Sequence, residues 1–98
     1  MAITEVGLER FLVEWYGRRA PARPLSDTAR RLTDGAASIS THGTQIRLLM
    51  VLAVPADDYA FGIFAAESAA AVAQVCVAAG APAERISAAV GWPDTLDW

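Results

Sequence analysis

Lysine is absent from this chain of 98 residues, and cysteine and histidine each occur only once, as Cys76 and His42. A single cysteine excludes a disulfide within the chain and any metal site built from several cysteines. It also fits a reducing compartment, so we expect a cytoplasmic protein. The apolar run around Val51 is shorter than the roughly 20 residues that cross a bilayer, so we do not expect a membrane as a partner.

Positive charge is also scarce, since eight arginines face eleven acidic residues and the formal net charge is -3. A negatively charged chain lacks the attraction that nucleic acid requires, so nucleic acid is not an expected partner either. The hydrophobic content is high, at 54%. We expect residues 1–98 to form a single domain, and a domain this small often hides surplus apolar surface against a second copy of itself.

Hydrophobic patterns predict six elements. Alternating side chains predict a strand over Arg10 to Tyr16, and a three- and four-residue repeat of Ala29, Leu32, Ala36 and Ile39 predicts a helix capped by Ser26 and ending before Gly43. Two β-rich runs, Ile46 to Val54 and Tyr59 to Phe64, flank a turn at Pro55 to Asp58. Ser68 is predicted to cap a second helix, whose apolar stripe is Val72, Val75, Cys76 and Ala79 and which ends at Gly80 and Pro82. A last strand is predicted at Arg85 to Val90, followed by a tail with Trp92 and Trp98.

This βαββαβ order predicts an α+β, ferredoxin-like fold, a four-stranded antiparallel sheet with both helices on one face. The other face would carry Leu12 and Tyr16 together with apolar groups from both central strands. Apolar surface of that extent is usually buried against another protein surface. We therefore predict a homodimer in which two such faces form a dimeric α+β barrel.

Short segments along nearly the whole chain share their order and spacing with a known family. These segments are Phe11-Leu12-Val13-Glu14, Ile46-Arg47, Val54-Pro55 with Asp57, Phe64 to Val72, and Ala79 to Pro82 followed by Arg85-Ile86. In these pieces the chain resembles small bacterial ferredoxin-like domains of unknown function, often labelled nickel-binding-protein-like. The family tends to carry a serine, a cysteine and an acid where this chain has Val51, Gly62 and Ala65. The loss of these polar groups argues against transferring metal binding, and we expect no metal and no cofactor.

Glu14 is the main candidate for chemistry, because it interrupts an apolar strand and a carboxylate there must be paired, exposed or shifted in pKa. Tyr16 lies two residues along the same face and could donate a hydrogen bond to Glu14 or to a substrate. The alternative is a solvated or arginine-paired carboxylate. His42 could orient a substrate oxygen, although its place near a helix C-terminus explains a histidine without catalysis.

Three functions remain open from the sequence. The first is a small-molecule-binding dimeric barrel, whether or not it is an enzyme, in which a hydrophobic or aromatic metabolite, such as one from secondary metabolism, meets Glu14, Tyr16 and His42. The second is binding of nickel or another metal, and the third is a structural module that only dimerises. In the first case we expect the pocket to be lined by Leu12, Val51, Gly62 and Phe64.

Overall fold

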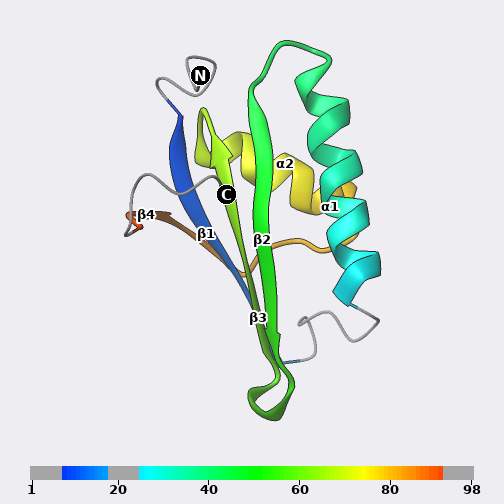
Figure 1. Cartoon of the computed structure of the whole chain (residues 1–98), viewed down its shortest axis with the longest axis vertical. Coiled ribbons are helices and arrows are strands. Elements are labelled where there is room, and N and C mark those ends of the chain that lie inside the picture. Colours follow the sequence, from blue (N-terminus) through cyan, green and yellow to red (C-terminus); the bar gives the residue numbers. More distant parts are fainter. Residues whose placement is uncertain (1–7, 18–24, 92–98) are drawn as a thin grey trace.

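The computed structural model describes residues 8–17 and 25–91. Its elements follow the order β1 (Glu9–Tyr16), α1 (Leu25–Ser40), β2 (Ile46–Val54), a 3-10 turn η3 (Pro55–Asp57), β3 (Tyr59–Ala66), α2 (Ala69–Ala78) and β4 (Arg85–Ala89). The strands form one antiparallel sheet in the order β2-β3-β1-β4, with the two helices side by side on one face (Figure 1). The predicted ferredoxin-like fold is confirmed. The predicted tail with Trp92 and Trp98 lies outside the described residues.

The core lies between the sheet and the helices. Phe11, Val13 and Trp15 are buried on β1, while the residues between them are less covered. They pack in one hydrophobic cluster with the whole predicted stripe of α2 and with the predicted stripe of α1 except Ala29, which is outside the cluster. The indole Nε1 of Trp15 donates to the carbonyl of Ala81 at 2.8 Å, so the largest core side chain has its polar atom satisfied. The period-two pattern of β1 therefore separates a core face from an open face.

The ends of α2 follow the predicted capping chemistry. The Ser68 hydroxyl accepts a hydrogen bond from the Ala71 N–H at 3.2 Å, as an N-cap should. At the other end, Ala81 donates to Cys76 and Gly80 to Val77, the paired bonds of a Schellman motif, with Gly80 at a φ of 75°. The start of α1 differs from the prediction, because the helix begins at Leu25 and includes Ser26 in its first turn.

A β-bulge interrupts the pairing of β2 with β3. Leu48 pairs with Phe64 and Met50 with Ile63, so Leu49 is the extra residue. The bulge changes which residues of β2 share a face. Beyond it, Val51 and Ala53 pack against the core, and Met50 and Leu52 are exposed on the other face.

None of the described helices is long and apolar enough to cross a membrane.

Val75 and Val77 provide a matched test of this core, because they lie two residues apart on α2 but are 0% and 65% exposed. We expect Val75→Ala to lower the free energy of unfolding by about 2 kcal/mol, since two buried methyl groups are lost and a cavity remains. Val77→Ala should change it by less than about 0.5 kcal/mol. Urea denaturation measures both values, and equal losses would contradict this placement of α2.

Candidate functional site

The open face, defined as the side of the sheet away from the helices, is arranged in rows by the strand register. Its central row is apolar except at β4 and consists of Met50, Ile63, Leu12 and Ser87. Towards the β2–β3 hairpin the next row contains Leu52, Phe61, Glu14 and Arg85. On the opposite side the row contains Arg47, Ala65, Arg10 and Ala89. Large apolar side chains are thus flanked by charged ones on both sides.

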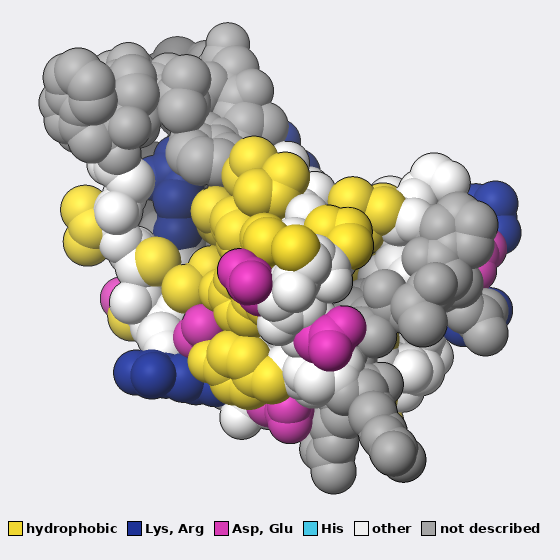
Figure 2. Space-filling view, turned by 90° about the horizontal axis from the view of Figure 1, so that it is seen from below, with side chains coloured by type: hydrophobic (Ala, Val, Ile, Leu, Met, Phe, Trp, Pro, Cys, Tyr) yellow, Lys and Arg dark blue, Asp and Glu magenta, His cyan; other side chains and the backbone are white. Residues whose placement is uncertain are grey.

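Several of these apolar side chains are exposed. Met50 is 38% exposed, Leu52 is 43% exposed and Tyr16, at the end of β1, is 40% exposed. Figure 2, seen from the hairpin end, shows a band of hydrophobic side chains with acidic side chains among them and arginines at the edges. Apolar side chains that remain exposed together make this face the candidate site.

Glu14 is the polar centre of the open face. Its Oε1 accepts hydrogen bonds from the phenol of Tyr16 at 2.8 Å and from that of Tyr59 at 3.1 Å. Only 14% of its side chain is exposed. Tyr16 comes from the same strand and Tyr59 from β3, directly opposite Tyr16 in the register. Two strands therefore hold one carboxylate oxygen in a fixed place.

The two tyrosine rings stack with centroids 5.6 Å apart, and Tyr59 also contacts the ring of Phe61. The pKa of Tyr16 is raised, chiefly by its hydrogen bond to Glu14 and then by burial and the charge of Glu14. The pKa of Tyr59 is raised chiefly by burial, followed by its hydrogen bond to Glu14. Both phenols therefore remain protonated donors.

Arg85 of β4 flanks the carboxylate on its other side. Its Nε lies 3.9 Å from Glu14 Oε2, longer than a hydrogen bond, and donates instead to the Ser87 hydroxyl at 3.1 Å. Its side chain is 67% exposed, so the ion pair with Glu14 is weak. As far as the described residues go, the Oε2 atom is left able to accept another donor.

The structure brings Glu14 and Tyr16 together as the sequence predicts, but it does not bring His42 to them. His42 follows α1, and its Nδ1 donates to the carbonyl of Ser38 at 3.0 Å. It lies four residues before Ile46, the first residue of β2. At that end of the sheet Ile46 pairs with Ala66, and Ala66 pairs with Glu9. Glu9 is five residues from Glu14, about 17 Å along β1. His42 thus lies at the opposite end of the sheet from the carboxylate, which separates it from the predicted site.

The four predicted pocket residues do not line one surface. Leu12 lies on the open face beside Glu14. Phe64 is 0% exposed in the core, Val51 packs against the same core, and a Cβ on Gly62 would meet the ring of Trp15 at 3.5 Å. Gly62 and Phe64 lie on the helix side of the sheet, because they alternate with Phe61 and Ile63 on the open face. Val51 pairs with Gly62 and therefore lies on the same side. The expectation that all four line a pocket with Glu14 is therefore corrected.

Sequence reasoning missed Tyr59 and Arg85. Tyr59 lies 45 residues after Glu14 in the sequence, at the first position of β3. The sequence patterns predicted no order of strands within the sheet, and it is the observed antiparallel pairing of β1 with β3 that places Tyr59 opposite Tyr16. The register between these two strands was the one signal that could have placed Tyr59 beside Glu14.

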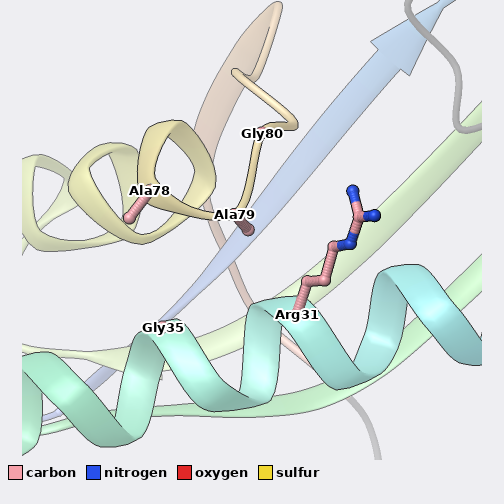
Figure 3. A pocket seen from close by; sticks show the side chains of 5 residues that line it. All are labelled: Arg31, Gly35, Ala78, Ala79 and Gly80. Carbon is pink, nitrogen blue, oxygen red and sulfur yellow. The ribbon is translucent and has the colours of Figure 1, made fainter.

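Other parts of the described chain offer less chemistry. A solvent-open cleft of about 400 Å³ lies where α1 meets the end of α2, lined by Arg31 and four small residues, Gly35, Ala78, Ala79 and Gly80 (Figure 3). Arg31 there pairs with Asp27 at 3.5 Å. Burial raises the pKa of Cys76 to about 12, which makes its thiol unreactive. Among the described residues, no group of three or more His, Cys, Asp or Glu is placed to hold a metal.

Comparisons with known proteins support the fold. The crystal structure of SCO4226 from Streptomyces coelicolor A3(2) is similar, with a TM-score of 0.59 over 80% of this chain and 91% of that chain, at 20% identity. At this identity the likeness shows a shared fold alone. No family model and no curated protein matches the sequence. The resemblance to the nickel-binding-like family therefore stays a prediction.

The two tyrosines are the only ones in the chain, so tyrosinate absorbance at 295 nm reports on this site alone. We expect both to titrate above the ordinary value near 10, because Glu14 and burial favour the protonated phenols. Glu14→Gln should lower the pKa of Tyr16 more than that of Tyr59, since the bond to Glu14 is the largest cause only for Tyr16. Tyr16→Phe and Tyr59→Phe variants assign the two transitions.

Glu67→Gln is the matched control, because Glu67 accepts from the Gln45 N–H at the other end of the sheet. It should leave both transitions unchanged. A raised phenol pKa stabilises the fold fully below pH 10, and this contribution disappears as the pH rises through the folded-state value. If Glu14→Gln shifts neither tyrosine, the network is not formed in solution.

Proposed function

We propose that this protein is a dimeric α+β barrel that binds a small hydrophobic molecule between two open faces, with Glu14 as its polar anchor. The observation that carries the proposal is a carboxylate fixed by two phenols within a largely apolar sheet face that the helices do not cover. A binding site is typically apolar with a few placed polar groups, and the open face has this composition.

The charges around Glu14 define the class of ligand. Glu14 and Arg85 carry opposite charges and lie 3.9 Å apart, so a ligand with a full charge of either sign would meet one repulsive neighbour. Oε1 already accepts from two phenols, whereas Oε2 has no partner within hydrogen-bond distance among the described residues. The best match is an uncharged apolar or aromatic molecule with a hydroxyl or N–H group that donates to Oε2.

A second copy of the chain is the proposed cover of the apolar face. Three strands of eight or nine residues and one of five, about 4.8 Å apart, present roughly 500 Å² of sheet. Two such faces would bury roughly 1,000 Å², which reaches the lower size limit of a specific interface. A ligand could then bind near Tyr16 and Tyr59, at the hairpin end of the face.

Catalysis would use the same carboxylate. Glu14 would take or return the proton of the ligand's hydroxyl group, and Tyr16 and Tyr59 would hold Oε1 in place during the transfer. This step is the extension of the binding function that the network best supports.

The binding proposal predicts a difference between two probes, 1-naphthol and naphthalene, that differ by one hydroxyl. In calorimetric titration, Glu14→Gln should weaken binding of 1-naphthol about tenfold or more, since a hydrogen bond to a charged group is lost. Binding of naphthalene, measured at a protein concentration at which native protein and variant are both dimeric, should stay within about twofold. Glu67→Gln should bind both probes like the native protein, and equal losses for both probes in Glu14→Gln would overturn Glu14 as the anchor.

The assembly is tested with a charge placed on each of two exposed apolar positions. Leu52→Glu, on the open face, should convert the dimer to a monomer in sedimentation equilibrium, because a carboxylate would be buried without a partner. Val77→Glu, on the outer side of α2, should leave the dimer intact. A monomeric native protein, or a dimer that only Val77→Glu disrupts, would contradict the proposed interface.

A further inference from the structure

The open-face side chains of β1 change sign along the strand. Arg10, Leu12 and Glu14 follow one another at every second residue, so the strand presents a cation, an apolar group and an anion in a straight line. Leu12 lies midway between the two charges. A line of this kind is complementary to its own copy when that copy runs in the opposite direction.

On the neighbouring strand β3 the size of the open-face side chains changes along the strand, as the charge does on β1. In the same three rows β3 presents Ala65, Ile63 and Phe61, a small, a medium and a large side chain. Reversal places the small Ala65 opposite the large Phe61, which suits close packing of two faces. The charges on β1 and the side-chain sizes on β3 therefore both match those of a reversed second copy, and the row of Leu12 and Ile63 is the centre of both patterns.

We infer that two copies pack face to face about a two-fold axis that crosses the strands at the row of Leu12 and Ile63, so that Arg10 of each copy faces Glu14 of the other. The inference rests on the proposed function, since it specifies the geometry of that dimer. It adds a residue from the second copy to each site at Glu14.

The other simple two-fold axis, parallel to the strands between β1 and β3, is disfavoured. It would superpose each row on the same row of the partner. Arg10 and Arg47 of both copies would then gather in one row, and Glu14 would lie against Phe61. Like charges and a carboxylate against an aromatic ring both raise the free energy of such an interface.

The distances and the side chains permit the inferred contact. Sheets that pack face to face lie about 10 Å apart with strands within about 30°, a gap that an arginine and a glutamate close together. Arg10 already has an interaction within its own chain, but a guanidinium carries further N–H donors. Glu14 Oε2 has two lone pairs, so it can accept from an arginine of the second copy and still accept from a ligand. Each site would then combine Glu14, Tyr16 and Tyr59 of one copy with the partner's Arg10.

Cross-linking at the two ends of the central row decides between the axes. Met50→Cys and Ser87→Cys each add one reactive thiol, while the buried thiol of Cys76 stays silent. With the inferred axis, Met50→Cys chains link to each other through a short bismaleimide. A mixture of tagged Met50→Cys and untagged Ser87→Cys chains gives no mixed product, because the two positions lie about 14 Å apart across three strand spacings.

Each other outcome overturns the inference in a recognisable way. Linked mixed pairs without linked Met50→Cys pairs indicate the axis along the strands. A dimer with no cross-link at all indicates that another surface is the interface. A native chain that is monomeric in sedimentation equilibrium overturns the proposed dimer as well, so the two failures are distinguishable.

Charge exchange gives an independent readout. Arg10→Glu should weaken self-association at least about tenfold, because each Glu14 would meet a like charge. An equimolar mixture of Arg10→Glu and Glu14→Arg chains should form a heterodimer near native affinity, since both contacts become attractive again. If Glu14→Arg fails to fold, Glu14→Gln replaces it and should still pair with Arg10→Glu more tightly than Arg10→Glu pairs with itself. Stronger self-association of Arg10→Glu would overturn the inferred axis.

Discussion

The structure depends on one constraint, that both helices cover the same face of a single sheet. Because side chains alternate along a strand, each strand must then satisfy two environments at once. On β1 this division is complete, with Phe11, Val13 and Trp15 in the core and the residues between them on the open face. Apolar side chains on the other face, such as Met50 and Leu52, therefore remain outside the core. Function is to be sought on the face that the helices leave uncovered.

Glu14 gains its character from this division. A carboxylate within an apolar face needs donors, and here the donors are neutral phenols that also contribute apolar ring surface. The carboxylate is thus held in place by the phenols, and Arg85, the cation paired with it among the described residues, stays at 3.9 Å. A buried salt bridge would have fixed Glu14 more tightly but left it less able to accept a new donor. The arrangement combines a defined position with remaining acceptor capacity.

The elements were predictable from the sequence, whereas the composition of each face was only partly so. Caps and periodicity located α2, with Ser68 at its start and Gly80 at its end. On β1 a charged residue marked the open face. On β3 both sets of side chains are apolar, so the pattern could not show that Phe64 belongs to the core and Phe61 to the open face. Tyr59 could be placed beside Glu14 only from the pairing of β1 with β3, which is set by tertiary structure and not by local propensity.

The bulge at Leu49 has a consequence for solubility. β2 is an edge strand of nine mostly apolar residues, and a flat edge of that kind invites further strands to add and grow into a fibre. One extra residue disrupts the regular spacing of backbone groups along that edge and increases its twist. Strand addition is thereby discouraged at the edge, while the broad face beside it stays regular. The protein can thus carry exposed apolar side chains on one face of the sheet without its edge strand recruiting further strands.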